Sequence, residues 1–137
     1  MTGDVAAFGL VNTALRASEL RQQVYANNIA NIDTPGYKRQ GVQFESVLQQ
    51  VMTNAASTSG GTAGSSGAAW NSATWAQLSQ VQPQVTTDTT TAISNNGNNV
   101  DVNAEMAKLA ENQLRYNGLV QDLQLRLHRM QTAINGV

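Results

Sequence analysis

The strongest constraint on the fold is a heptad repeat in the last third of the sequence. Alternating steps of four and three residues reach eleven positions, ten of them apolar: Val102, Met106, Leu109, Gln113, Tyr116, Val120, Leu123, Leu127, Met130, Ile134 and Val137. A repeat of about 3.5 residues held over this length is typical of a long helix in a coiled coil. At about 1.5 Å per residue, the helix would be roughly 50 Å long. We expect Asp101 or Asn103 to cap its N-terminus and Asn135-Gly136 to end it.

A second amphipathic helix is predicted near the N-terminus, from about Val5 to about Asn31. Its apolar stripe consists of Ala7, Leu10, Ala14, Ala17, Leu20 and Val24, and is widened by Phe8, Val11 and Leu15. Neither of the two long helices can bury its stripe alone, so we expect them to pack on each other, on copies of the chain, or on both.

The middle of the chain has weaker patterns. Apolar residues between Phe44 and Met52 indicate a short helix, and residues 53–67 contain only Thr, Asn, Ala, Ser and Gly, which predicts a flexible loop. Residues 70–93, with two tryptophans and a threonine cluster, predict short strands or irregular structure. The tryptophans, Trp70 and Trp75, would form a small satellite core or an exposed contact. Residues 95–99 have the composition of a turn.

The predicted fold class is therefore mainly α: two long terminal amphipathic helices paired as a coiled coil, with an irregular or short-stranded middle rich in Gly, Ser and Thr. We divide the chain into residues 1–52, with the first helix and an asparagine-rich motif, an irregular middle at 53–99, and the C-terminal coiled-coil helix at 100–137. With 137 residues, these segments are expected to form one structural unit.

Composition excludes several classes of function. A formal net charge of -1 gives no reason to expect a nucleic-acid partner, which needs a clustered cationic surface. The chain has no cysteine, which excludes disulfides, thiolate zinc sites and thiol catalysis. It contains no apolar run of about 20 residues, so we do not expect it to span a membrane, and its N-terminus lacks the pattern of a secretory signal.

Candidate catalytic and metal-binding residues are few. The single histidine, His128, follows the seam position Leu127 and is expected to flank a helix interface, because no second ligand stands at helical spacing. Glu105, Glu111 and Asp122 each precede a cation by three or four residues, so we expect a solvated helix face and no acid/base pair. We therefore predict no enzymatic activity, no cofactor and no metal.

The stretch ANNIANIDTPGYKR, residues 26–39, concentrates amides at the end of the first helix. Pro35 disfavours helix at Thr34, and Gly36 can adopt the positive φ of the third residue in a type II turn, so the helix should end near residues 31–33. Residues 37–39 would then leave the turn along an extended, exposed path. The asparagines indicate either a polar docking patch or a helix end that faces water.

Two blocks of this sequence resemble a known family. The run ALRASELRQQVYANNIANIDTPGYKRQGVQFES is similar to the N-terminal motif of the flagellar axial proteins, the rod, hook and hook-associated family. The block GNNVDVNAEMAKLAENQLRYNGLVQDLQLRLHRMQTAING resembles the C-terminal helix of one of the two small proximal rod proteins of that family, more than that of the other, FlgC. Together the blocks cover more than half of the chain.

The resemblance implies a structural subunit of the flagellar proximal rod that polymerises helically and transmits torque. It implies a place in the periplasmic rod of the basal body and export by the flagellar type III system without a cleaved signal. The implied partners are other rod subunits and adjacent basal-body proteins, including the proximal rod and the adaptor to the export gate and MS ring, in a helical homo- or hetero-assembly. The alternatives are another axial protein such as FlgC, or a helical adaptor or chaperone that does not polymerise.

The resemblance also implies which residues lie where subunits meet. The family motif matches at Asn28, Asn31, Thr34, Pro35, Gly36 and Tyr37. The helix seams that we expect to be buried by pairing consist of Leu10, Leu15, Leu20, Val24, Val102, Met106, Leu109, Tyr116, Val120, Leu123, Leu127, Met130 and Ile134. The Gly- and Ser-rich residues 53–67 depart from the family, so the surface there can differ.

Overall fold

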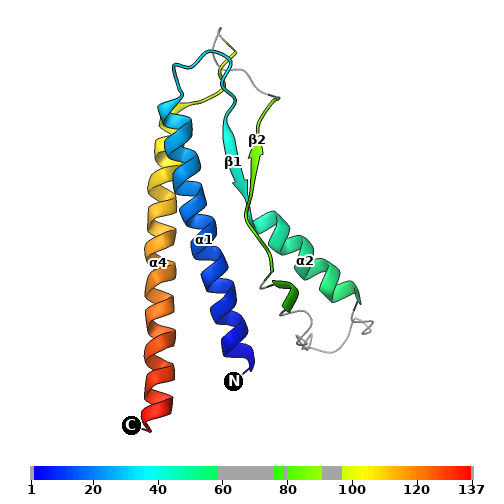
Figure 1. The fold of residues 1–137 in the computed structure, drawn as a ribbon, viewed down its shortest axis with the longest axis vertical. Helices are drawn as coiled ribbons and strands as arrows, with labels where there is room; N and C mark the ends of the chain where they lie inside the picture. The colour runs from blue at the N-terminus through cyan, green and yellow to red at the C-terminus, as the bar shows by residue number, and fades with distance from the viewer. Residues whose placement is uncertain (1, 59–75, 79, 91–96, 137) are drawn as a thin grey trace.

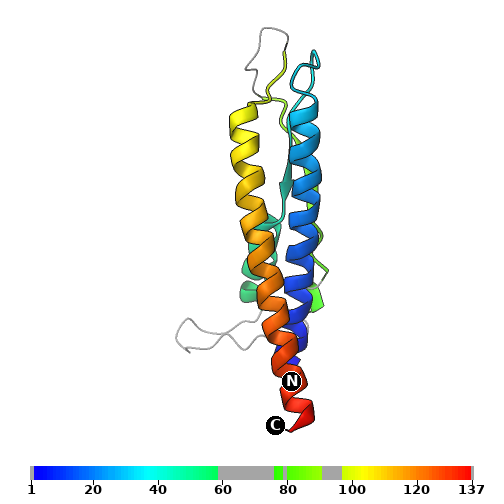
Figure 2. The same ribbon diagram turned by 90° about the vertical axis from the view of Figure 1, so that its left-hand side faces the viewer.

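Two long antiparallel helices form the body of the molecule. The computed structural model describes residues 2–58, 76–78, 80–90 and 97–136. Its elements are α1 (Thr2–Ala30), β1 (Gln40–Gln43), α2 (Glu45–Thr58), β2 (Gln84–Thr87) and α4 (Val102–Asn135). Helices α1 and α4 lie side by side in both views (Figures 1 and 2). Strand β1 lies beside α1, β2 lies on the far side of β1, and α2 slants away from α1 after β1 ends (Figure 1). The predicted mainly α fold with paired terminal helices is confirmed.

Helix α4 is bounded by two caps that its sequence predicts. Asp101 is the N-cap, and its Oδ1 accepts hydrogen bonds from the backbone N–H groups of Asn103 at 2.9 Å and Ala104 at 3.2 Å. Gly136 ends the helix with a left-handed φ of 68°, and its N–H donates to the Thr132 carbonyl. Of the two predicted N-cap residues, Asp101 is therefore the one used. These caps satisfy backbone groups that the helix itself leaves without partners.

Replacing Asp101 with alanine is expected to lower the free energy of unfolding by about 1 kcal/mol, because two backbone donors lose their acceptor. Urea denaturation followed by circular dichroism measures this change. The matched control is Asp33→Ala, which makes the same substitution at an exposed position outside the helices. An equal loss in both variants would contradict the capping role.

The turn after α1 has the predicted geometry. Gly36 has a φ of 73°, and the Tyr37 N–H donates to the Thr34 carbonyl at 3.2 Å. The last residue of α1 is Ala30, one residue before the predicted range. A proline that disfavours helix and a glycine that tolerates positive φ are sufficient to reverse the chain here.

A two-stranded antiparallel sheet follows the turn. Gln40 pairs with Thr87 and Gln43 with Gln84, so β1 and β2 align along their whole length. For residues 70–93 the sequence left short strands or irregular structure open, and the structure has a short strand at Gln84–Thr87. The sequence analysis did not predict β1, because Gln40–Gln43 contains one β-branched residue and only its partner strand makes it a strand.

Helix α2 corrects the predicted boundary of the flexible loop. The structure continues this helix to Thr58, so the prediction of a loop is wrong for residues 53–58. Ala55 and Ala56 favour helix, and the Thr53 hydroxyl donates to the Gln49 carbonyl at 2.8 Å. The remainder of the predicted loop, residues 59–67, lies outside the described residues, and so do Trp70 and Trp75.

A small apolar cluster joins α1 to α2. Ala17, Phe44 and Val81 are buried together, and partly buried residues pack around them: Ala14, Val47, Leu48 and Val51. Helix α1 therefore packs on two sides, against α4 and against this cluster. The width of its predicted apolar stripe reflects both contacts.

Candidate functional site, a polar clamp between the terminal segments

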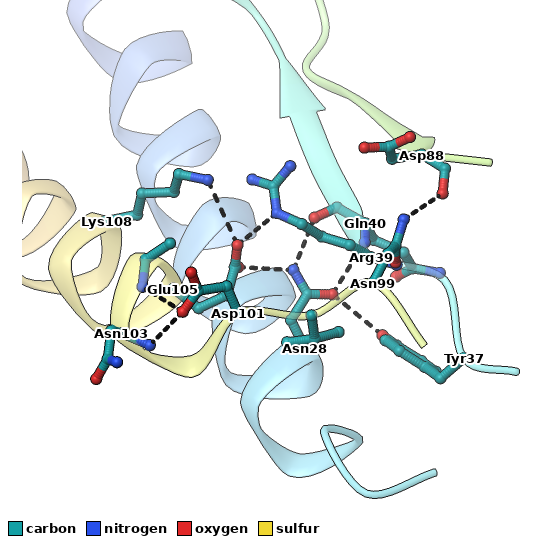
Figure 3. A network of polar contacts seen from close by, with 12 residues as sticks. Asn28, Tyr37, Arg39, Gln40, Asp88, Asn99, Asp101, Asn103, Glu105 and Lys108 are labelled. Carbon is teal, nitrogen blue, oxygen red and sulfur yellow. Dashed lines mark hydrogen bonds and ion pairs between the residues drawn. The ribbon is translucent and has the colours of Figure 1, made fainter. Parts of the chain in front are cut away.

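Polar side chains from both terminal segments meet where α1 ends and α4 begins (Figure 3). We call this group the polar clamp; it consists of Asn28, Tyr37, Arg39, Gln40, Asn98, Asn99 and Glu105. Its hydrogen bonds join residues as far as 77 positions apart in the sequence. The clamp therefore connects the asparagine-rich motif directly to the C-terminal block.

Asn28 is the centre of the clamp and is 0% exposed. Its Nδ2 donates to the Gln40 carbonyl and to Glu105 Oε2, both at 2.8 Å. Its Oδ1 accepts from the Gln40 N–H at 2.9 Å and from the Tyr37 hydroxyl at 3.2 Å. Both donors and both acceptor positions of this amide are used, so a substitution leaves several partners unsatisfied.

Glu105 brings a negative charge into the clamp and is also 0% exposed. Its carboxylate forms an ion pair with Arg39, contacts Lys108 Nζ at 3.5 Å and accepts the hydrogen bond from Asn28. The prediction that Glu105 belongs to a solvated helix face is therefore wrong. Lys108, the cation three residues later, does contact Glu105, but the carboxylate is buried against Asn28 of α1 and Arg39.

The other two acids do pair on the helix surface as predicted. Arg115 Nη2 lies 2.7 Å from Glu111 Oε1, and Arg126 Nε lies 2.7 Å from Asp122 Oδ2. Both pairs have the i, i+4 spacing of exposed helix contacts.

Two asparagines before α4 complete the clamp. Asn98 Nδ2 donates to the carbonyls of Asn31, Ile32 and Thr34, at 3.0, 2.8 and 2.9 Å. It thereby ties the start of α4 to carbonyl groups of the turn that follows α1, two of which also accept from backbone N–H groups within that turn. The sequence analysis placed this residue in a turn and did not predict the contact.

Asn99 holds the strands in place. Its Oδ1 accepts from the Arg39 N–H at 2.6 Å, and its Nδ2 donates to the Asp88 carbonyl at 2.9 Å. Asn98 and Asn99 are both buried beside Gly97, whose φ is 82°. A pair of asparagines after a glycine, just before a helix cap, is the signal that could have identified these residues.

The six motif residues fall into two groups. Asn28 and Tyr37 lie within the clamp, whereas Thr34, Pro35 and Gly36 are exposed at the turn and Asn31 is half-buried beside them. The expectation that residues 37–39 are free for contacts is wrong, because Lys38 Nζ donates to the Gly97 carbonyl at 2.7 Å and Arg39 pairs with Glu105.

The predicted seams are covered unevenly in a single chain. On α1, Val24 is buried and Leu10, Leu15 and Leu20 are half-buried. On α4, the half-buried seam residues are Val102, Leu109, Tyr116, Val120 and Leu123. The exposed seam residues are Met106, Leu127, Met130 and Ile134, with exposed fractions from 37% to 83%. Glu105 and Asn112 are the buried residues of α4.

The electrostatics of the clamp keep the Tyr37 phenol in its hydrogen-bonding, protonated form. Burial raises the pKa of Tyr37, and the charge of Glu105 raises it further, so the phenol stays protonated and donates to Asn28. No group of three His, Asp or Glu side chains that could hold a metal occurs among the described residues, and His128 is exposed on α4. In the described part of the chain, no helix is apolar and long enough to cross a bilayer.

Comparisons with known proteins agree with this arrangement. A family model described as Flagella basal body rod protein matches residues 12–38, which end in the clamp. The Flagellar basal body rod protein FlgB of Bacillus subtilis is 33% identical over 128 residues, which cover 92% of this chain and 91% of the relative. The FlgB of Borreliella burgdorferi is 38% identical over 97 residues, 71% of this chain and 72% of that protein.

The Salmonella typhimurium FlgB is 31% identical over 138 residues, 96% of this chain and 94% of the relative. Identity above 30% extends over nearly the full length of both chains in two of these comparisons. The chain therefore belongs to the flagellar basal body rod protein family.

Proposed function

We propose that this chain, a structural subunit of the bacterial flagellar basal body rod, polymerises helically with neighbouring subunits and transmits torque. The observation that carries the proposal is the apolar seam at the C-terminal end of α4, which a single chain leaves exposed. Leu127, Met130 and Ile134 are all exposed on this helix. Burying such side chains contributes about 25 cal/mol per Å² of apolar surface, so repeated contacts favour an assembly.

The polar clamp supports the mechanical part of the proposal. Sliding α1 past α4 by one helical turn, about 5.4 Å, would break the hydrogen bond between Asn28 and Glu105, so that a buried amide N–H and a buried carboxylate would each lose a partner. The clamp therefore opposes shear between the paired helices. A subunit that keeps its helix register can pass a load from one neighbour to the next.

The exposed turn is the proposed contact with neighbouring subunits. The loop between α1 and β1 lies at one end of the molecule (Figure 1), and within it Thr34, Pro35 and Gly36 are exposed, close in sequence to the half-buried Asn31. In this proposal Asn28 and Tyr37 contribute by holding the turn in position. The segments 1–52 and 100–137 then act as one unit, because the clamp joins them.

The family also suggests a location and partners. We propose that the chain is exported by the flagellar type III system without a cleaved signal and takes its place in the periplasmic rod. Its partners there would be other rod subunits and adjacent basal-body proteins, including the adaptor to the export gate and MS ring. The role is structural, without enzymatic activity.

Ile134→Glu is expected to reduce incorporation into basal bodies by about tenfold or more, since a carboxylate would have to be desolvated in the subunit contact. Ile134 is 83% exposed, so the urea midpoint of the variant chain should not change. Quantitative mass spectrometry of purified basal bodies measures the incorporation. The control is Gln121→Glu, which adds the same charge at an exposed position outside the predicted seam. Normal incorporation of Ile134→Glu would contradict the proposal.

Asn31→Ala and Gly36→Val are expected to block rod assembly while export continues. The Asn31 side chain orders the turn by donating to the Asn27 carbonyl and accepting from the Thr34 hydroxyl. Valine cannot readily adopt the φ of 73° at position 36. Swimming assays, with immunodetection of the exported subunit, measure the two effects separately. Normal motility of both variants would refute the role of the turn.

A further inference from the structure

A polar cleft opens beside the clamp, between α1, α4 and β1. It has a volume of about 310 Å³, and its walls include Tyr25, Arg39, Lys108 and Asn112. Arg39 belongs to both the clamp and the wall of the cleft, whereas Asn28 and Glu105 do not line the cleft.

The cleft contains a buried acceptor without a donor. Asn112 is 4% exposed, and its Nδ2 donates to the Ser18 carbonyl at 2.8 Å. Its Oδ1 has no hydrogen-bond partner among the described residues. Buried amide oxygens in folded proteins are almost always paired with a protein group or an ordered water, so Asn112 brings an incompletely satisfied amide to the wall of the cleft.

Two cations of the cleft are already occupied by acids of the chain. Arg21 forms an ion pair with Glu45, and Arg115 lies 2.7 Å from Glu111 and 3.6 Å from Glu45. Burial by itself raises the pKa of Glu45, but the hydrogen bond and charge of Arg21 outweigh it and lower the pKa overall. Glu45 therefore stays ionised and paired with Arg21 and Arg115.

The other two cations, Arg39 and Lys108, have hydrogen-bond donors that their contacts with Glu105 do not fully use. Arg39 uses Nε for Glu105, and its two terminal nitrogens make no hydrogen bond with the described residues; Figure 3 shows them pointing away from Glu105. Lys108 Nζ contacts the same carboxylate oxygen at only 3.5 Å. Tyr25 also lines the cleft. Burial raises the pKa of its hydroxyl group, although the charge of Arg21 acts in the opposite direction, so the phenol remains protonated.

Charge and geometry together define the ligand. The four cations Arg21, Arg39, Lys108 and Arg115 meet three carboxylates, those of Glu45, Glu105 and Glu111, which leaves one positive charge. One carboxylate balances that charge, whereas a polyanion would exceed it. A guanidinium with two free nitrogens suits a carboxylate, which it can bind with two parallel hydrogen bonds.

We propose that the cleft receives an acidic side chain from a neighbouring rod subunit. Its carboxylate binds the terminal nitrogens of Arg39 and Lys108 Nζ, the cations of the cleft wall whose donors the chain leaves incompletely used. This inference rests on the proposed function, because it names the chemistry of one subunit contact. The apolar seam drives association of the subunits, and this polar contact would fix their relative orientation.

Carbodiimide cross-linking of purified basal bodies tests the inference, because the reagent joins a lysine amine to a carboxylate in contact with it. The chain has two lysines, and Lys38, outside the cleft, is the internal control. We expect mass spectrometry to find Lys108 joined to an Asp or Glu of another polypeptide. If the chain is present and Lys108 is joined only to acids of its own chain, the cleft inference is overturned. If the chain is missing from the basal bodies, the proposed function fails, and the inference with it.

Substitutions provide a second readout. Lys108→Glu should lower incorporation into basal bodies about tenfold, because it opposes the incoming carboxylate, and Lys108→Arg should retain it. Arg16→Glu makes a similar charge reversal at an exposed position of α1 outside the cleft and should incorporate normally. Unchanged incorporation of Lys108→Glu would overturn the inference.

Discussion

Replacing Asn28 with alanine is expected to lower the free energy of unfolding by about 4 kcal/mol, because the substitution removes both donors and both acceptors of a buried amide. The Gln40 N–H and carbonyl, the Glu105 carboxylate and the Tyr37 hydroxyl all lose a partner. A domain of this size is stable by only about 5–15 kcal/mol, so the loss is a large part of the total. Urea denaturation followed by circular dichroism measures it.

The matched control for Asn28 is its neighbour in the sequence. Asn27 is exposed on the same helix, and Asn27→Ala should change the free energy of unfolding by less than about 0.5 kcal/mol. Similar effects of the two substitutions would show that the clamp contributes nothing specific. The comparison also separates clamp contacts from helix propensity, because both variants exchange asparagine for alanine within α1.

Glu105→Gln is expected to lower the free energy of unfolding by about 3 kcal/mol, because it leaves Arg39 beside a neutral amide in a buried contact. The new amide nitrogen is a donor that would face the donor of Asn28 if it replaces Oε2, or the donors of Arg39 and Lys108 if it replaces Oε1. The same urea titration measures the change.

Glu111→Gln is the control for the loss of a carboxylate on α4. Glu111 pairs with Arg115 at the surface, with its side chain 60% exposed, and exposed pairs of this kind contribute at most about 0.5 kcal/mol. If Glu111→Gln cost as much as Glu105→Gln, burial of the Glu105 charge would not be the cause of its effect.

Local sequence signals were sufficient to predict the two long helices and the features that end them, but not the end of α2, which extends to Thr58. The heptad repeat identified α4, Asp101 and Gly136 marked its limits, and Pro35 with Gly36 marked the turn after α1. Each of these features depends on residues within a few positions of one another. For that reason they could be deduced before any tertiary contact was known.

The clamp could not be predicted in the same way, because its partners are distant in the sequence. Asn28 and Glu105 are 77 residues apart, and Asn98 reaches Asn31 across 67. An amide in a helix end has the same local pattern whether it faces water or a buried carboxylate. The resemblance identified the asparagine-rich motif, but its contacts within the chain became clear only from the fold.

The face that α4 turns toward its own chain also escaped prediction. Glu105 and Asn112 are seven residues apart, so they share one line along the helix, next to the apolar line that contains Met106. The heptad pattern marked the apolar line but could not show that polar residues beside it bind α1. Polar contacts within the chain and apolar residues exposed beside them are what the proposed assembly requires.

Cryo-electron microscopy of purified basal bodies tests the central claim most directly. We predict that density for this chain occupies the rod, with α1 and α4 paired and Leu127, Met130 and Ile134 covered by a neighbouring subunit. A rod that lacks this chain, or that contains it with these three side chains facing solvent, would contradict the account.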